Sequence, residues 1–432
     1  MTSKEYQHII ALIQREVIPA IGCTEPIAVA LCVAKARETL GQMPERIEMQ
    51  LSANVLKNAL GVGIPGTQMI GLPIAIALGA LIGRSDYQLE VLRDCTPEAV
   101  AQGQRYIDEG RISIQQKADT PHKLYIEATC IGSEGQRSSA IIAGEHTHFV
   151  HLDRNGQVLI CSDTEPCSDA QQADTVELTL RGVYDFATTV PLDDIRFLLD
   201  TKQMNTAAAE FSFEHSCGHN LGLLLHNGAG HSVLGRTTFS RMVAYTAGAC
   251  DARMAGAQIP VMSNSGSGNQ GITATMPVVV YAEDNHNTEE ELIRALALSH
   301  LTVIYIKQSL GRLSALCGCV VASTGSSCGI TYLMGGRYPQ IAAAVQNMIA
   351  NITGMICDGA KPSCALKVAT GTSTAVLSAI LAMNGKHVGG LEGIIDNDVD
   401  RSIRNMSRIG AESMLDTDRL ILQIMTDKMG GC

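Results

Sequence analysis

Hydrophobic positions recur along the chain with two different periods, and the change of period suggests two kinds of structure. Residues 5–17 place apolar side chains three and four positions apart, which predicts an amphipathic helix. A second helix is expected from Thr24 to a stop at Gly41. The longest apolar run, 69–83, has 15 residues and contains several glycines. It is too short to span a membrane, so we expect a buried helix there.

Strand-like alternation follows the second helix, and a helical pattern returns from about residue 170. The predicted strands, with a helix at 96–109 among them, cover 46–52, 111–117, 123–131, 138–144 and 148–153. In the later part, Thr288 and Glu291 form a capping box ahead of a long helix. We therefore predict an α+β fold. A mainly helical domain comes from both chain ends, 1–44 and 166–432, and a smaller α+β domain is inserted at 45–165.

Composition and charge narrow the class of protein. Of the 432 residues, 46% are hydrophobic but only 4% are aromatic, so small aliphatic side chains must fill the core of a globular protein. The formal net charge of −11 argues against a surface for nucleic acid or anionic membranes. The first segment is amphipathic and carries charges, unlike a signal peptide. We expect a cytoplasmic protein with a small-molecule partner, and the sequence leaves a homo-oligomer open.

The stretch GCTEP, residues 22–26, places a cysteine directly before a helix. Thr24 is the expected N-cap, and Pro26 suits the first helical turn. Free backbone amides and the helix dipole at such a position lower the pKa of a thiol and bind a carboxylate. Cys23 is therefore a candidate reactive thiol. Spacing alone slightly favours the simpler interpretation, a capped helix with a buried cysteine.

Two further polar stretches could bind a small anion. In 51–71, Asn54 and Lys57 precede a loop rich in glycine and proline, and MSNSGSGNQGITATMP at 262–277 begins with small and polar residues. Such loops can present backbone amides to a carboxylate or phosphate. The second stretch matches neither a Walker A loop nor a dinucleotide-binding loop. The alternatives are an ordinary turn for the first and a flexible loop for the second.

Four cysteines lie in two short stretches, RLSALCGC and MICDGAKPSC. Cys317 precedes Cys357 by 40 residues, and Cys357 precedes Cys364 by 7. Three thiolates from these stretches could hold three irons of a cubane cluster and leave the fourth iron open as a Lewis acid. Zinc would instead take four protein ligands in a structural site, or nitrogen-rich ligands in a catalytic one. Spacing alone leaves the cluster as one option beside buried packing cysteines.

Together, GCTEP, SAN..KN..GV.IPGT, DARM.GA..P..SNSGSGNQGI, RLSALC and MICDGA..SCA.K resemble the L-cysteine desulfidase family of the UPF0597 type. That family is related to the alpha subunits of iron–sulfur L-serine dehydratases, and the resemblance covers nearly the whole chain. It implies an oxygen-labile [4Fe–4S] cluster held by Cys317, Cys357 and Cys364, with Cys319 as a substitute for Cys317. The implied reaction is α,β-elimination of L-cysteine to pyruvate, ammonia and sulfide.

The resemblance also implies roles for the other motifs. Cys23 falls opposite the histidine of serine dehydratases that is thought to act as base, so its thiolate is our candidate base, and Lys57 is a second catalytic candidate. Cys432 is a candidate for the open iron, because some serine dehydratases place a terminal cysteine there; a frayed tail is the alternative. The residues expected to contact substrate are Thr24, Asn54, His146, Asn264, Ser265, Gly266, Asn269 and Gln270.

Three alternatives remain. The same scaffold could act on L-serine or another β-substituted amino acid, because the elimination is the same. A pyridoxal-phosphate lyase could use Lys361 or Lys367 as its Schiff-base lysine and SNSGSGNQG as its phosphate site. A thiol or cluster sensor without enzymatic activity would usually carry an output module such as a DNA-binding domain, and no basic helix indicates one.

Overall fold

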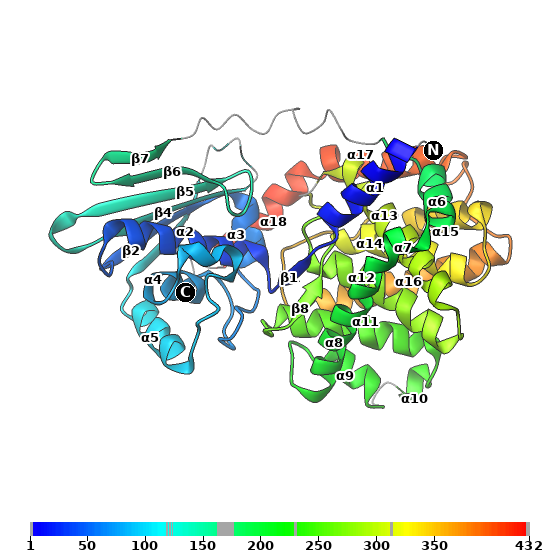
Figure 1. The fold of residues 1–432 in the computed structure, drawn as a ribbon, viewed down its shortest axis with the longest axis horizontal. Helices are drawn as coiled ribbons and strands as arrows, with labels where there is room; N and C mark the ends of the chain where they lie inside the picture. The colour runs from blue at the N-terminus through cyan, green and yellow to red at the C-terminus, as the bar shows by residue number, and fades with distance from the viewer. Residues whose placement is uncertain are drawn as a thin grey trace.

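The structure has two parts, one built around a six-stranded sheet and the other from helices (Figure 1). It is a computed structural model, and it describes residues 3–117, 120, 122, 124–161, 177–228, 231–311 and 314–428. The predicted α+β fold is confirmed. The predicted boundary at 165 lies outside the described residues, and the division into domains stays a prediction.

The smaller part is a mixed sheet with the strand order β3-β2-β4-β5-β6-β7. β2 and β3 run parallel, and the other neighbours run antiparallel. The five predicted strands are present, but β7 was missed because its residues are all exposed and show no alternation. The strands are β2 (Arg46–Leu51), β3 (Ile112–Gln116), β4 (Tyr125–Ile131), β5 (Arg137–Ala143), β6 (Phe149–Arg154) and β7 (Gln157–Cys161).

Four helices accompany this sheet: α2 (Thr24–Leu40), α3 (Ala53–Ala59), α4 (Leu72–Leu81) and α5 (Pro97–Asp108). α2 packs on β4 and β5 and against α4. Its side chains are buried on nearly every side, from Ile27 to Leu40. α2 lies within 1–44, a range predicted to belong to the helical part. The structure instead places it in the core of the smaller part, because an apolar helix can cover the buried face of the sheet.

The helical part has its own hydrophobic core, with α14 at its centre between α12, α13, α15 and α16. Buried hydroxyls of α14 bond to carbonyls one turn earlier, as in Ser323 to Cys319 and Thr324 to Val320. The capping box predicted at Thr288 and Glu291 begins α13. The helices are α1 (Ser3–Glu16), α6 (Leu180–Thr189), α7 (Leu192–Ile195), α8 (Leu199–Glu214), α9 (Leu221–His226), α10 (His231–Leu234), α11 (Thr238–Met254), α12 (Gly268–Asp284), α13 (Glu289–Leu310), α14 (Gly318–Leu333), α15 (Tyr338–Ile352), α16 (Cys364–Met383), α17 (Val399–Arg408) and α18 (Leu415–Asp427).

Among the described helices, α16 alone is long and apolar enough to cross a membrane by length and composition. Half of its apolar stretch is buried inside the protein, where α16 packs against α11, α14 and α15. Core helices of soluble proteins share these properties, so this single helix is weak evidence for a membrane span.

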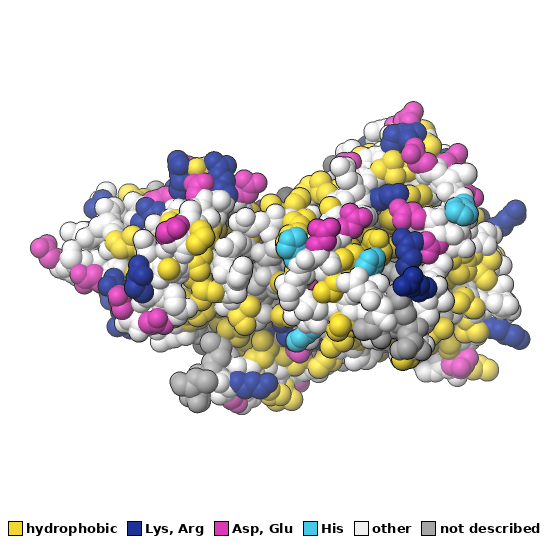
Figure 2. Space-filling model, turned by 90° about the horizontal axis from the view of Figure 1, so that it is seen from below, with side chains coloured by type: hydrophobic (Ala, Val, Ile, Leu, Met, Phe, Trp, Pro, Cys, Tyr) yellow, Lys and Arg dark blue, Asp and Glu magenta, His cyan; other side chains and the backbone are white. Residues whose placement is uncertain are grey.

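The contacts that join the parts include a pair of short strands and the last helix. β1 (Pro19–Ile21) pairs antiparallel with β8 (Pro260–Met262), a pairing of strands too short to be recognised by alternation. It places the start of α2 beside the loop that leads into α12. α18 lies between the two parts and contacts α3, with Leu422 in the core of the smaller part (Figure 1). From below, the parts meet at a narrower middle, and charged side chains of both signs are interspersed on this face (Figure 2).

Candidate active site

A cavity of about 140 Å³ lies where the two parts meet, and most of the motifs singled out in the sequence contribute to its wall. The contributing segments are the start of α2, the end of α3, the end of α11, the loop into α12, the end of α13, the loops on both sides of Cys317 and Cys357, and the start of α16. Residues separated by several hundred positions in sequence therefore share one small space.

Backbone pairing brings Cys317 and Cys357 together. The amide of Cys317 donates to Met355 O at 2.9 Å, and the amide of Cys357 donates to Ala315 O at 2.7 Å. The two side chains are hydrogen-bonded to each other. This contact lowers the pKa of Cys357 and raises the pKa of Cys317. This pairing of two backbone segments brings Cys317 and Cys357 together although 40 positions separate them in the sequence.

Cys364 is the first residue of α16, and a tight turn returns the chain to it from Cys357. Gly359 in this turn has φ +92°, and a Cβ there would lie 2.0 Å from the carbonyl oxygen of Lys57. Only glycine allows so close an approach. The Asp-Gly turn between the two cysteines therefore packs directly onto α3, which places the thiol-bearing loop against Lys57.

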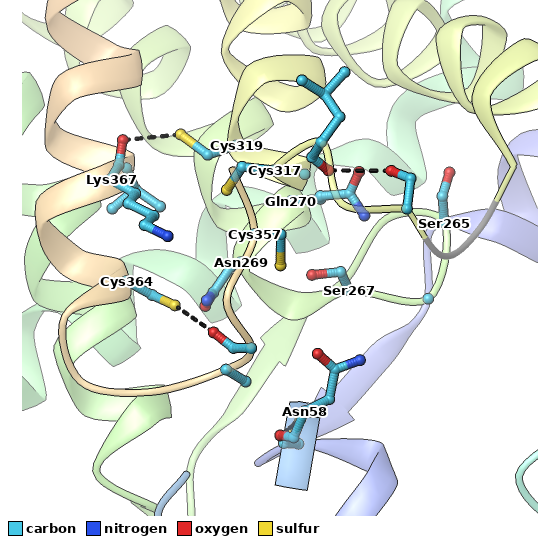
Figure 3. A pocket seen from close by; sticks show the side chains of 18 of the residues that line it. Asn58, Ser265, Ser267, Asn269, Gln270, Cys317, Cys319, Cys357, Cys364 and Lys367 are labelled. Atoms are coloured by element: carbon cyan, nitrogen blue, oxygen red, sulfur yellow. Dashed lines mark hydrogen bonds between the residues drawn. The ribbon is translucent and has the colours of Figure 1, made fainter. Parts of the chain in front are cut away.

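Cys317, Cys319, Cys357 and Cys364 all line the cavity, but the sulfur of Cys319 is turned to the carbonyl of Lys367 (Figure 3). Cys364 Sγ makes a longer contact of 3.6 Å with Gly359 O. Cys319 Sγ donates to Lys367 O at 2.9 Å. Within the described residues, no three His, Cys, Asp or Glu side chains are close enough to share a single metal ion. Each cysteine of a cubane ligates a different iron, so three thiols around a wider space fit a cluster better than a lone zinc ion.

In the GCTEP stretch, Cys23 rather than Thr24 is the N-cap of α2, with φ −100° and ψ 132°. The expected N-cap Thr24 is the first helical residue, and its hydroxyl donates to Glu25 at 3.3 Å. The expected low thiol pKa is also wrong. Burial raises the pKa of Cys23 well above its ordinary value, and the charge of Glu25 raises it further. The Cys23 thiol donates a hydrogen bond to Glu25 Oε2, with 2.9 Å between Sγ and Oε2. Cys23 is therefore a thiol, and not a thiolate, in the resting protein.

Glu25 was missed as a site residue although it belongs to the quoted motif. Its carboxylate lines the cavity and accepts from Cys23, Thr24 and, at 3.0 Å, Asn58 Nδ2. Burial alone would raise the pKa of Glu25, but the charge of His146 and the hydrogen bonds lower it below the ordinary value. Glu25 is therefore a half-buried, ionised carboxylate.

Lys57 lines the cavity from α3, and its side chain is only 3% exposed. It forms an ion pair with Asp418 of α18, 361 positions later in the chain. Its charge also contributes to the lowered pKa of Cys357. Asn54 is half-buried on the same helix but is not part of the described wall. Of the two polar residues of α3 named from sequence, the structure brings only Lys57 to the cavity.

The loop before α12 is tightly folded. Ser265 and Gly266 both have positive φ, 49° and 79°, and Asn264 forms a backbone bridge with Ser267. Ser265, Gly266, Asn269 and Gln270, all named from sequence, line the cavity at the start of α12. Two buried amide oxygens in this group, Asn269 Oδ1 and Gln270 Oε1, have no hydrogen-bond partner in the described structure. Buried acceptors of this kind are typical of a site that awaits a donor from a ligand.

Asn264 lies behind this wall rather than in it. It is fully buried, and its Nδ2 donates to Nδ1 of His300 at 3.0 Å and to the His300 carbonyl at 3.1 Å. Nε2 of the same ring lies 3.0 Å from Thr275 Oγ1, whose own proton goes to Gly271 O. The ring is therefore neutral, with its proton on Nε2, and burial lowers the pKa of His300 to about 3. Asn264 thus fixes the loop through His300, and contact with substrate stays a prediction.

The low pKa of His300 predicts that the stability of the protein depends on pH. The unfolded chain takes up a proton near the ordinary pKa of about 6.5, whereas folded His300 resists protonation until about pH 3. Stability from this group is therefore complete above about pH 6.5 and is lost as the pH falls. When the pH falls from about 7.5 to about 5, His300 should lower the free energy of unfolding by about 2 kcal/mol. Denaturant titrations of wild type and His300→Gln at both pH values measure it, and equal losses would contradict the prediction.

Arg253, at the end of α11, was also missed as an individual residue. It is 5% exposed and lines the cavity, with its Nε donating to Gly22 O at 3.1 Å. A Cβ at Gly268 would lie 2.3 Å from this Nε, so the guanidinium rests directly against the first turn of α12. Lys307, which was not named from sequence, and Lys367, named only for the pyridoxal alternative, also line the wall.

The two remaining residues named from sequence have different outcomes. His146 is not part of the described wall, but its charge acts on Glu25, so it lies near the site. Cys432 lies outside the described residues.

Comparison with known proteins identifies the family of this chain. A family model described as the serine dehydratase alpha chain matches residues 86–423. A UPF0597 protein of Bacteroides fragilis is 66% identical over 432 residues, which cover 100% of both chains. UPF0597 proteins of Porphyromonas gingivalis and Oleidesulfovibrio alaskensis are 50% and 43% identical, and each alignment covers 99% of this chain and 100% of the relative.

These matches make the chain a serine-dehydratase-like enzyme of the lyase class, a group that typically depends on iron–sulfur chemistry. The chain belongs to the UPF0597 family, which is related to the alpha chains of iron–sulfur serine dehydratases.

Proposed function

We propose that the protein is an L-cysteine desulfidase that converts L-cysteine to pyruvate, ammonia and sulfide with a [4Fe–4S] cluster. The observation that carries the proposal is the convergence of Cys317, Cys357 and Cys364 on one cavity that also holds Cys23. The choice of cysteine over serine rests on the resemblance of the motifs to the desulfidase family. We further propose that the protein acts in the cytoplasm on a small molecule, without a nucleic-acid or membrane partner.

Cys317, Cys357 and Cys364 would hold the cluster rather than Cys319, because Cys319 Sγ donates to Lys367 O at 2.9 Å, a closer contact than the 3.6 Å from Cys364 Sγ to Gly359 O. When bound, the cluster supplies an open iron that acts as a Lewis acid on the sulfur of the substrate. Lys57 and Lys367 also line the cavity, and their positive charges help the protein to hold anionic thiolates in a buried place. The burial of the wall limits the access of water to the reacting groups.

The chain's own residues then orient the substrate and move its α-proton. The first turn of α12 offers free backbone amides, and the orphan oxygens of Asn269 and Gln270 offer acceptors. Cys23 is the candidate acceptor of the α-proton, and it must lose its own proton first because it rests as a thiol. Loss of the α-proton and of sulfide gives aminoacrylate, and water converts this product to pyruvate and ammonia.

Two alternatives use the same scaffold differently. L-serine needs the same elimination with hydroxide as the leaving group, so it is the first competing substrate. A pyridoxal-phosphate mechanism needs a lysine free to form a Schiff base, but Lys361 and Lys367 both pair with Asp358. Their ion pairs favour the cluster over the pyridoxal alternative.

The test uses anaerobically purified full-length protein. We expect about four irons and four acid-labile sulfides per chain, and release of sulfide and pyruvate in equal amounts from L-cysteine. Activity should fall on exposure to air. The same preparation is then given L-serine, with pyruvate as the readout. A higher kcat/KM for serine would assign the enzyme to the alternative, and an iron-free protein after reconstitution would sink the cluster mechanism.

A further inference from the structure

The cavity wall carries more positive than negative side chains. Among the described residues that line it, Glu25 is the only carboxylate, whereas Lys57, Arg253, Lys307 and Lys367 are cations. An α-amino acid carries one charge of each sign on neighbouring atoms. Burying an ammonium is costly unless an anion or several acceptors receive it. The single carboxylate is therefore the strongest partner that this wall offers to a substrate ammonium.

Two of the cations are already bound to carboxylates. Lys57 is paired with Asp418, and Lys367 is paired with Asp358 while it also donates to Ile356 O at 2.8 Å. The only hydrogen bond that Arg253 makes within the described structure goes to a neutral acceptor, the carbonyl of Gly22. Its guanidinium has five N–H donors in a planar fork that suits a carboxylate. Arg253 thus has donors left for a carboxylate ligand.

Glu25 and Arg253 lie close to the same thiol. Glu25 Oε2 lies 2.9 Å from Cys23 Sγ, and Arg253 Nε donates to the carbonyl of Gly22, the residue before Cys23, at 3.1 Å. Arg253 rests against the first turn of α12, whose free amides favour an anion at the same place. A carboxylate accepts about four hydrogen bonds, and the side chains of Cys23, Thr24 and Asn58 supply three to Glu25. An ammonium can take the remaining position or displace the weak thiol donor.

We propose that Glu25 and Arg253 bind the two charged groups of an α-amino acid, Glu25 the α-ammonium and Arg253 the α-carboxylate. The α-carbon then lies beside Cys23, and the β-substituent points to the three thiols. This inference rests on the proposed function for the position of the β-substituent, but the recognition of the amino acid stands by itself. The ammonium also neutralises the negative charge of Glu25, which lowers the free energy of the Cys23 thiolate.

The experiment measures binding of three small probes to anaerobically purified full-length protein by ligand-observed NMR titration. L-alanine carries both charged groups, propionate lacks the ammonium and ethylamine lacks the carboxylate. Glu25→Gln should lower the affinity for L-alanine by about 10- to 100-fold, the effect of losing a charge-assisted hydrogen bond. The affinity for propionate should change by less than about 3-fold. Arg253→Met should weaken L-alanine and propionate but not ethylamine.

The matched control is Glu38→Gln. Glu38 also lies on α2 and accepts two hydrogen bonds from Ser85, but it is not part of the described cavity wall. It should leave all three affinities unchanged. Three results would overturn the inference. Glu25→Gln could weaken the binding of L-alanine and of propionate equally, or weaken neither. Wild type could also fail to bind L-alanine. None of the probes has a leaving group, so a lack of sulfide release would overturn the proposed function alone.

Discussion

Cys357→Ser is expected to release nearly all iron from the anaerobically purified protein and to lower lyase activity by about 1,000-fold or more, because a Lewis acid contributes several kcal/mol. Cys357 lies between the other two proposed ligands. It is hydrogen-bonded to Cys317, and the tight turn at Gly359 joins it to Cys364. A serine hydroxyl is a poor ligand for iron–sulfur clusters, which use thiolates. Iron and acid-labile sulfide per chain, with the visible absorption of the cluster, measure the loss.

The same chain provides a matched control for this substitution. Cys319 lies two residues from Cys317 and is equally buried, but its thiol donates to Lys367 O. A serine hydroxyl can make the same bond, so Cys319→Ser should keep its iron while Cys317→Ser loses it. The reverse pattern would show that the ligand from the RLSALCGC stretch is Cys319 and that our assignment is wrong.

Asp418→Asn is expected to lower the free energy of unfolding by about 3 kcal/mol, the typical effect of leaving one buried charge without its partner. Lys57 is 3% exposed and Asp418 is 24% exposed, so water screens this pair only in part. The variant leaves a buried ammonium facing a neutral amide. It also weakens the contact of α18 with α3. Urea titration followed by circular dichroism measures the change in the midpoint and in the free energy.

Asp416→Asn is the control for this prediction. Asp416 lies on the same helix and pairs with Arg419, but the two side chains are 91% and 82% exposed. Exposed pairs contribute little, so the change should be below about 0.5 kcal/mol. Similar losses in both variants would mean that the whole of α18, rather than the buried ion pair, determines the stability.

Elements with a clear hydrophobic period could be predicted from the sequence. The helix at 5–17, the buried helix within 69–83 and the strand at 46–52 correspond to α1, α4 and β2, because each buries one face or all faces in a core. β1, β8 and β7 could not be predicted. The first two have three residues each, too few for a pattern, and β7 is exposed along its whole length.

The site was predicted in part, and the missing part has a physical reason. Motifs identified the segments, and the structure brings Cys23, Lys57, Gln270 and the three proposed cluster thiols to one cavity. Sequence could not show that Cys23 donates to Glu25, because burial and a neighbouring charge outweigh the helix dipole. The charge of Arg253 reaches Cys23 only through folding, which brings α11 beside the start of α2 across 230 positions.

The ion pair between Lys57 and Asp418 has a consequence for how the protein is made. The lysine emerges early from the ribosome, and the three thiols follow by residue 364, but α18 can dock only after residue 418 has been synthesised. Until then Lys57 has no Asp418 to pair with, and the contact of α18 with α3 cannot form. Docking of α18 is therefore a late step, and it gives the buried ammonium of Lys57 its carboxylate partner.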